Sequence, residues 1–166
     1  SLHDALPISE ALAKAGVSLT ICARTKVDIE KAADQLSSHN VKITAIACDI
    51  TTEEGKNKIL EACDSPDILI NNAGGPPPGI WSDWVREDFL KALNSNMLTP
   101  IDLIKKVLPI MIEKKWGRIV NITSQAVKAP VPALGLSNSA RTGLTGYVAG
   151  TSRQVARFGV TINNLL

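Results

Sequence analysis

The sequence predicts an α/β protein with a parallel sheet, and two short apolar runs support that prediction. Residues 68–70 are Ile, Leu and Ile, and two asparagines, an alanine and two glycines end this run at residues 71–75. Residues 118–124 form a second run of strand-forming residues, which ends in Ser124. Continuous apolar runs of this length are typical of strands buried on both faces, as in parallel sheets. Segments with the apolar spacing of helices lie between the strand candidates, as in an α/β fold.

The composition is that of an ordinary globular protein in a reducing compartment. The chain has 166 residues, of which 45% are hydrophobic and 20% are charged, and this length suits one domain. A net charge of +2 gives no electrostatic case for binding nucleic acid or a membrane surface. No apolar run reaches the length of a membrane span, and no signal peptide is visible. Cys22, Cys48 and Cys63 lack the spacing of a disulfide framework or a metal site, so we expect a cytoplasmic protein without bound metal.

The first third of the chain alternates between helix and strand patterns. Residues 8–15 have helical apolar spacing, and Gly16 ends that helix. Thr25 can cap a helix that runs to about residue 37. The remaining elements expected here are strands at 17–23 and 41–48 and a helix at 53–63. Residues 1–7 fit none of these patterns, so we expect an unassigned leader of native or foreign origin.

The rest of the chain predicts two long helices and a last strand at residues 160–166. A helix from about residue 86 to 114 carries apolar residues at three- and four-residue steps, but polar residues 94–96 interrupt it. That interruption is costly unless the polar groups find partners. The second helix runs from Pro132 to about residue 158, and its closely spaced glycines are expected to allow tight packing. The tryptophans before the first long helix are interpreted as core anchors, with a substrate mouth as the alternative; they are Trp81 and Trp84.

The carboxyl end of the strand at 68–70 is the first candidate binding site. Ligands of open α/β sheets bind outside the carboxyl ends of strands, and glycine lets a ligand approach the backbone closely. The alternative is a hairpin turn, which would require a strand that pairs straight back. Prolines follow instead at residues 76–78, and proline cannot donate to a ladder. We therefore expect a cofactor at residues 71–75.

Three stretches resemble motifs of the short-chain dehydrogenase/reductase family. They are Asn71-Asn72-Ala73-Gly74, the helix around Asn96, and Ile122-Thr123-Ser124, and the resemblance covers residues 8–166. It implies a Rossmann-like fold, a doubly wound parallel sheet with helices on both faces, that binds a nicotinamide dinucleotide. Within the family, the sequence looks most like 3-oxoacyl-(acyl carrier protein) reductase relatives. Family members pair two long helices across subunits, so the resemblance also implies a homo-oligomer, either a dimer or a tetramer.

Two parts of the family's pattern are absent from the sequence. The family has a first strand and a glycine-rich phosphate loop before the helix at 8–15, whereas no glycine precedes Gly16 here. The family also continues past the strand at 160–166 with a substrate lid and a last strand. We therefore expect a fragment, in which residues 8–166 form a partial NAD(P)-binding domain.

The expected cofactor is NADP, with NAD as the alternative. Arg24 follows the second strand candidate of the family's pattern, where an NAD-binding fold has a carboxylate, and a guanidinium suits the 2′-phosphate of NADP. A solvated surface arginine is the other interpretation. The resemblance places Asp49 and Ile50 beside the adenine ring, although Asp49 or Thr51-Thr52 could instead start the next helix. The residues that it places at the nicotinamide are Asn72, Ala73 and Gly74.

The resemblance also assigns roles in catalysis. Ser124 would hydrogen-bond the substrate carbonyl, and Asn96 would hold a water of the proton relay. The family's Tyr-x-x-x-Lys motif falls on Ser137 and Arg141, which are one helical turn apart and can both face the cofactor ribose. Arginine keeps the charge of the lysine. An alkyl hydroxyl, however, is a weaker acid than a phenol by about three pKa units, which is on the order of 4 kcal/mol. Ser137 or water would then serve as the proton donor.

Two functions remain open on the sequence alone. The leading one is an NADP-dependent oxidoreductase that moves hydride between nicotinamide and a small carbonyl or alcohol substrate, with Arg141 at the ribose. The other is a catalytically silent relative that binds nucleotide or partners without turnover. The missing tyrosine favours the silent relative, whereas Ser124, Asn96 and the cation at 141 favour the enzyme.

Overall fold

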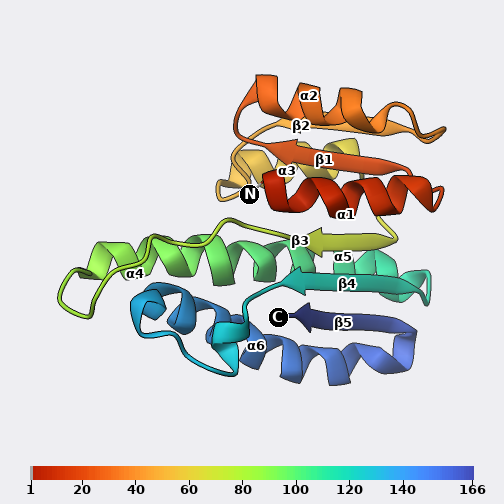
Figure 1. Cartoon of the computed structure of the whole chain (residues 1–166). Coiled ribbons are helices and arrows are strands. Elements are labelled where there is room, and N and C mark those ends of the chain that lie inside the picture. The colour runs from red at the N-terminus through yellow and green to blue at the C-terminus, as the bar shows by residue number, and fades with distance from the viewer. Residues whose placement is uncertain (1) are drawn as a thin grey trace. The chain divides into compact units, whose positions relative to one another are not determined.

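The chain forms two compact units, each with its own parallel sheet. The computed structural model describes residues 2–166, with side chains from residue 5 onward. The N-terminal unit covers Ser1–Asp64 and the C-terminal unit covers Ser65–Leu166. The first unit has a sheet of two strands and the second a sheet of three, as Figure 1 shows. All strand pairs are parallel, and helices connect them, so the prediction of a parallel α/β fold is confirmed.

The N-terminal unit places its helices around a two-stranded sheet. Strand β1 pairs with β2 in parallel, from Leu19 opposite Ile43 to Ala23 opposite Ala47. Helix α2 packs against both strands and buries Ile29 and Leu36. The elements of this unit are α1 (Leu2–Lys14), β1 (Leu19–Ala23), α2 (Lys26–Leu36), β2 (Ile43–Ala47) and α3 (Glu53–Ala62).

Helix α1 begins earlier than the sequence indicated. The prediction started the helix at residue 8, whereas α1 begins at Leu2 and passes through Pro7. Pro7 removes only its own N–H from the helical ladder, and its side chain is exposed. The predicted stop is confirmed. Gly16 adopts a φ of 83°, its N–H donates to the Ala13 carbonyl, and the N–H of Val17 donates to the Leu12 carbonyl, which together form a Schellman motif.

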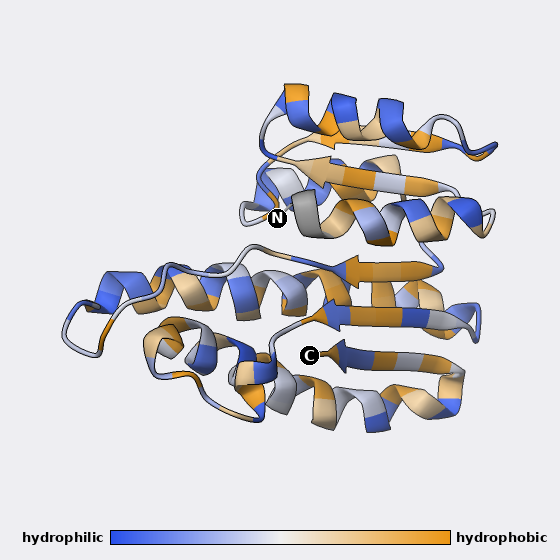
Figure 2. Cartoon of the chain, viewed as in Figure 1, coloured by the Kyte–Doolittle hydropathy of each residue, from blue (hydrophilic) through white to orange (hydrophobic). Residues whose placement is uncertain are grey.

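The C-terminal unit contains the strands that end in the candidate site. Its sheet has the order β3-β4-β5, and Asn71 lies opposite Asn121 in the β3–β4 ladder. β3 is apolar up to its last residue, Asn71, and Figure 2 shows hydrophilic residues near the carboxyl ends of β4 and β5. The core of the unit includes Ile104, Met111 and Ile119, each fully buried. The elements are β3 (Ile68–Asn71), α4 (Arg86–Leu93), α5 (Thr99–Glu113), β4 (Gly117–Ile122), α6 (Gly135–Val155) and β5 (Val160–Leu165).

A π-helical turn, Asn94–Leu98, replaces the regular helix between α4 and α5. The prediction was one helix from residue 86 to 114 with a polar interruption, and the π-turn lies at that interruption. Pro100 has no N–H to offer the carbonyl four residues earlier, so the regular pattern cannot continue there. The hydroxyl of Ser95 donates to the Lys91 carbonyl at 3.0 Å. The polar groups therefore find partners, as the stability of an interrupted helix requires.

The two tryptophans before α4 differ in their surroundings. Trp84 is half-buried and meets Phe89 edge-on, with ring centroids 6.4 Å apart, so the prediction that it anchors the core is confirmed. Its ring also occupies the space that a Cβ at Gly135 would need. Trp81 is 87% exposed, so core anchoring was wrong for this residue. The difference arises because the loop directs the side chain of Trp84, and not that of Trp81, toward Gly135 at the start of α6.

Candidate active site

The two strand ends that the sequence singled out lie side by side. Strands β3 and β4 are parallel neighbours, and their last ladder pair is Asn71 with Asn121. Asn72 follows that pair on β3, and Ser124 lies three residues past it on β4. The hairpin alternative for residues 71–75 is excluded, because the partner strand of β3 runs parallel and comes from residues 117–122.

A row of asparagine side chains crosses all three strands of this sheet. The amide of Asn71 donates to the Oδ1 atom of Asn121 at 2.8 Å, and the amide of Asn121 donates to the Oδ1 atom of Asn164 at 3.0 Å. Asn121 is fully buried and Asn71 is 7% exposed. Sequence reasoning did not find this asparagine ladder. Its only signal was an asparagine near the end of each of three strand candidates.

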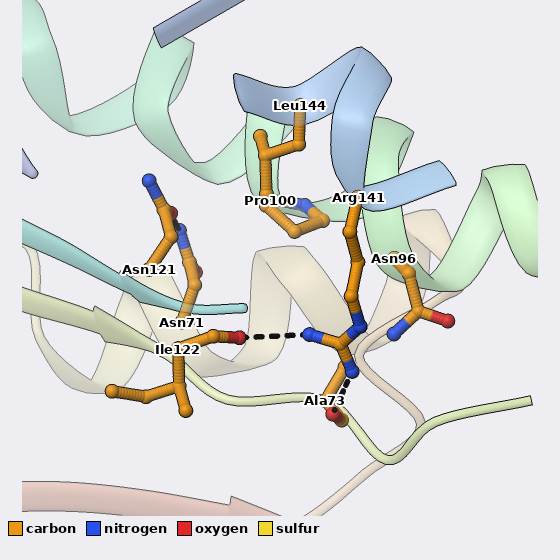
Figure 3. A pocket seen from close by; sticks show the side chains of 8 residues that line it. All are labelled: Asn71, Ala73, Asn96, Pro100, Asn121, Ile122, Arg141 and Leu144. Carbon is orange, nitrogen blue, oxygen red and sulfur yellow. Dashed lines mark hydrogen bonds between the residues drawn. The ribbon is translucent and has the colours of Figure 1, made fainter. Parts of the chain in front are cut away.

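Arg141 reaches from α6 to the ends of both β3 and β4. Its Nη1 donates to the carbonyls of Ile122 and Thr123, at 2.9 and 3.0 Å, and its Nη2 donates to the Ala73 carbonyl at 3.4 Å. Figure 3 shows the guanidinium between these strand ends. The side chain is only 7% exposed, and burial lowers the pKa of Arg141.

The side chains of Ser137 and Arg141 are hydrogen-bonded to each other. The Nε of Arg141 donates to the Ser137 hydroxyl oxygen at 3.1 Å, as the spacing of one helical turn permits. Ser137 is 5% exposed, so its hydroxyl is buried in this structure. The hydroxyl still carries one proton that it can donate. The sequence placed the two residues on the same helical face, but it gave no indication of this bond.

Ser124 lies two residues past the end of β4, has an extended conformation, and caps a short 3₁₀ turn, Gln125–Val127. Its hydroxyl oxygen accepts a hydrogen bond from the Ala126 N–H at 3.2 Å. The side chain is half-buried. Capping uses the oxygen as an acceptor and leaves the hydroxyl proton for another acceptor, such as a carbonyl oxygen. The turn-capping interpretation and the binding interpretation are therefore compatible.

Asn96 links the π-turn to the end of β3. Its amide donates to the Gly74 carbonyl at 2.9 Å, and its Oδ1 atom lies 3.0 Å from the Ser95 hydroxyl oxygen. Asn96 is 3% exposed. It borders a cavity of about 10 Å³, which has room for about one water molecule. The residues around this cavity (Figure 3) are Asn71, Ala73, Asn96, Pro100, Asn121, Ile122, Arg141 and Leu144.

The predicted adenine-side residues belong to the N-terminal unit. Arg24 follows β1 and is exposed, while Asp49 and Ile50 are half-buried after β2. The Asp49 carboxylate accepts from the N–H and the hydroxyl of Thr51, at 2.9 and 2.7 Å. These bonds, with a smaller contribution from the charge of Arg24, lower the pKa of Asp49. Thr52, and not Asp49, caps α3, because its hydroxyl accepts from the Gly55 N–H at 3.0 Å.

The end of β3 offers what the nicotinamide part of a dinucleotide requires. Gly74 and Gly75 are exposed, and a Cβ added at Gly75 would meet only the Arg141 Nη2 atom, at 4.0 Å. The side-chain nitrogen of Asn72 is buried and has no hydrogen-bond partner. A buried donor without an acceptor is costly, so a ligand oxygen there would be stabilising. The cavity of about 10 Å³ is far too small for a nicotinamide ring.

Other kinds of site find no support in the described part of the chain. None of the helices from Leu2 onward is both long and apolar enough to cross a membrane. Among the side chains that the structure describes, residues 5–166, no group of three or more His, Cys, Asp or Glu could hold a metal ion. The three cysteines are free.

Parallel strands joined by helices, with polar groups and glycines at the carboxyl ends of neighbouring strands, define a Rossmann-like, dinucleotide-binding class of protein. A family model described as "short chain dehydrogenase" matches residues 5–166. The chain belongs to this short-chain dehydrogenase family.

Comparisons with individual proteins agree with that assignment. Acetoacetyl-CoA reductase of Cupriavidus necator is 31% identical over 117 residues, which are 69% of this chain and 47% of that protein. A 2,3-dihydroxy-2,3-dihydro-p-cumate dehydrogenase of Pseudomonas putida is 27% identical over 165 residues, 96% of this chain and 64% of that protein. The chain thus spans less than two thirds of the length of these curated relatives.

A solved structure shows the same likeness in three dimensions. A substituted form of actinorhodin polyketide ketoreductase with NADPH superposes with a TM-score of 0.87 at 28% identity. The match covers 96% of this chain and 63% of that one. The Rossmann-like fold expected from the sequence is therefore confirmed.

Proposed function

We propose that the protein is an NADP-dependent oxidoreductase that transfers hydride between nicotinamide and a carbonyl or alcohol substrate, with 3-oxoacyl thioesters as the substrate class. One observation carries the proposal. The carboxyl ends of β3 and β4, with Asn72 and Ser124, are adjacent in one parallel sheet, and the exposed Gly74 and Gly75 leave the backbone open to a flat ligand. The similarity to acetoacetyl-CoA reductase and to a polyketide ketoreductase supports the substrate class.

Each residue has a role that its hydrogen bonds permit. The Ser124 hydroxyl donates to the substrate oxygen, while its own oxygen stays bonded to the Ala126 N–H. Asn96 fixes the end of β3 through Gly74 and borders the single-water cavity, so it positions a water of the proton relay. One Nη2–H of Arg141 has no acceptor among the described residues and can donate to the ribose, and Ser137 or water gives the proton. NADPH, when bound, supplies the hydride.

The choice of NADP over NAD rests on Arg24. Its guanidinium stands exposed at the end of β1, as expected for a 2′-phosphate ligand. We expect Arg24→Ala to lower the preference for NADPH over NADH by about tenfold, measured as the ratio of the two kcat/KM values. Lys26→Ala, which removes a neighbouring exposed cation, is the matched control and should leave that ratio unchanged. An unchanged ratio in the Arg24 variant would show that residues other than Arg24 set the preference for NADPH over NADH.

A second function is favoured by a specific observation. Ser137 is buried and bonded to Arg141, so the position of the family's proton donor holds a weak acid away from solvent. A protein of this kind could bind nucleotide without turnover. General acid catalysis contributes about 10²–10⁴-fold, so slow reduction through water is also compatible with this geometry.

The deciding experiment measures NADPH oxidation with acetoacetyl-CoA and a panel of simple ketones. We expect turnover that falls at least a hundredfold in Ser124→Ala and stays unchanged in Ser139→Ala, an exposed serine on α6. Equal rates in the two variants would show that Ser124 takes no part in the reaction. NADPH binding without oxidation of any substrate would establish the silent function instead.

Two further properties belong to this proposal. A homo-oligomer, a dimer or tetramer, is supported by the exposed glycines of α6, Gly146 and Gly150, which have open space around them. A cytoplasmic location is supported by three free cysteines. Size-exclusion chromatography with light scattering and fractionation of cells would test the two points separately.

A further inference from the structure

The hydrogen bonds of Arg141 are almost all made within the protein. A guanidinium has five N–H donors, and four of them have acceptors here: the Ser137 hydroxyl and the carbonyls of Ile122, Thr123 and Ala73. The side chain is 7% exposed. A residue that served mainly as a cofactor ligand would keep more donors free before the cofactor arrives.

The carbonyls that accept from Arg141 lie where the ladder between β3 and β4 stops. Asn71 and Asn121 are the last paired residues. Ala73 lies two residues past that pair on one strand, and Ile122 and Thr123 lie just past it on the other. The segments that follow the two strands separate from here. The one after β3 leads to the exposed glycines, and the one after β4 leads to Ser124. The guanidinium bridges this divergence, as Figure 3 shows for Ile122 and Ala73.

We propose that Arg141 is a positioning residue, whose guanidinium clamps the ends of β3 and β4 to α6, and that Ser137 orients this clamp. The inference deepens the proposed function, because the clamped strand ends are the edge on which the nicotinamide would lie. The clamp sets the spacing between Asn72 and Ser124 before any ligand binds. At most one Nη2–H remains for the ribose.

The chemistry of the two side chains explains why they occur together. A planar guanidinium presents donors in fixed directions, so it can bond carbonyls of two different strands at once. The ammonium of a lysine is a single point with rotating donors and cannot span them in the same way. A serine places its oxygen 3.1 Å from the Nε of Arg141. Ser137 thus accepts from the Nε of Arg141, and both Nη nitrogens are left for the strand carbonyls.

The first test uses the unmodified chain without ligand. ¹⁵N-detected NMR of arginine side chains should resolve separate, slowly exchanging Nη signals for Arg141, because hydrogen bonds on both nitrogens hinder rotation of the group. Arg153, exposed on the same helix, is the internal control and should give one averaged signal. Added NADPH should leave the Arg141 pattern in place. An averaged Arg141 signal that sharpens into separate lines only with NADPH would overturn the proposal.

The second test uses variants and hydrogen exchange without ligand. The Thr123 N–H donates to the Leu165 carbonyl at 2.7 Å, and the Cys48 N–H in the other unit donates to the Ala23 carbonyl at 2.9 Å. We expect Arg141→Met to speed exchange at Thr123 and Ala126 at least tenfold, with Cys48 unchanged. Arg141→Lys should show a smaller acceleration, and Ser137→Ala the smallest. If Arg141→Met instead weakens NADPH binding while these exchange rates stay as in the unmodified chain, Arg141 is a ligand and not a clamp.

These outcomes separate the inference from the proposed function. A resolved Arg141 signature in a protein without turnover would defeat the oxidoreductase proposal and leave the clamp intact. Normal turnover with a freely rotating Arg141 side chain would support the oxidoreductase proposal and overturn the clamp. The NMR measurement on the unmodified chain decides the question even where a variant fails to fold.

Discussion

The side-chain amide of Asn71 donates to the Oδ1 atom of Asn121 across the last pair of the β3–β4 ladder, at 2.8 Å. Residues that face each other in a ladder share one face of the sheet, so their side chains can bond. Asn121 passes the interaction on to Asn164 of β5. The three strands that end in the candidate site are therefore joined by side chains as well as by backbone.

Removing the central amide of this asparagine ladder should destabilise the C-terminal unit. Asn121→Leu keeps the approximate volume but leaves the Asn71 nitrogen and the Asn164 oxygen without partners, each at a cost of about 1–3 kcal/mol. We expect the free energy of unfolding to fall by about 2–4 kcal/mol in urea titrations. Asn163→Ala, an exposed neighbour on β5, is the control and should change it by less than about 0.5 kcal/mol. Equal values for the two variants would show that the ladder adds nothing.

The glycines of α6 should respond in opposite directions to alanine. A Cβ at Gly143 would lie 2.5 Å from the sulfur of Met97, whereas Gly146 has nothing within 4 Å. The close packing expected from the sequence therefore holds for Gly143 and not for Gly146. Gly143→Ala should destabilise the protein by about 1 kcal/mol, and Gly146→Ala should stabilise it by about 0.5–1 kcal/mol.

The same pair of variants tests the proposed oligomer. If Gly146 packs against a second copy, alanine there should weaken self-association, which light scattering would detect as a lower mass. A stabilised protein with unchanged mass would exclude this face of α6 from the contact.

Cys22 should be unreactive toward alkylating agents at neutral pH. Burial, with a smaller effect of the adjacent Cys48, raises the pKa of the Cys22 thiol to about 12. Only the thiolate reacts, so iodoacetamide at pH 8 should modify Cys22 about a thousandfold more slowly than in the unfolded chain. Mass spectrometry of tryptic peptides can follow each cysteine. Modification at the unfolded rate would contradict the burial.

The sign of the accompanying pH effect follows from the raised pKa. The folded state holds the Cys22 proton more tightly than the unfolded state, so this contribution to stability is complete below the pKa of the unfolded thiol. It is lost as the pH rises from about 9 toward 12. Stability should therefore decline over that range, and less steeply in Cys22→Ala.

The hydrogen bonds of Thr51 should hold Asp49 ionised in acid. The pKa of Asp49 is lowered mainly by the hydroxyl and then by the N–H of Thr51, so the carboxylate favours the folded state above its unfolded pKa and loses this effect as the pH falls. Thr51→Val should raise the pKa of Asp49 in an NMR titration of its carboxyl carbon. Thr25→Val, whose hydroxyl makes no capping bond, is the control. An unmoved pKa in the Thr51 variant would assign the shift to other groups.

Much of the fold could be predicted because its signals are local. Apolar runs marked the strands, and Gly16 marked the end of α1. The order of Asn72 and Ser124 on neighbouring strands followed from the motifs. The start of α1 was missed because proline is a break signal in a sequence, whereas Pro7 sits on the exposed side of a continuous helix.

The contacts of the candidate site could not be predicted, because they depend on register and on side-chain reach. The sequence places Asn163 and Asn164 side by side, and only the pairing of β4 with β5 shows which one meets Asn121. Likewise, the spacing of Ser137 and Arg141 put them on one helical face, but whether the guanidinium turns outward or toward Ala73 depends on where three strands end.

The π-turn between α4 and α5 makes the orientation of the two helices sensitive to the gain or loss of a single residue. One residue corresponds to about 100° of rotation around a helix axis. Deleting one residue between 94 and 98 would remove the extra residue of the π-turn and rotate α4 by that angle relative to α5. Ala92 of α4 would then turn away from Leu136 and Ala140 of α6, and Asn96 would leave the Gly74 carbonyl. Homologous chains that differ in length here are consequently expected to have a differently shaped entrance to the pocket.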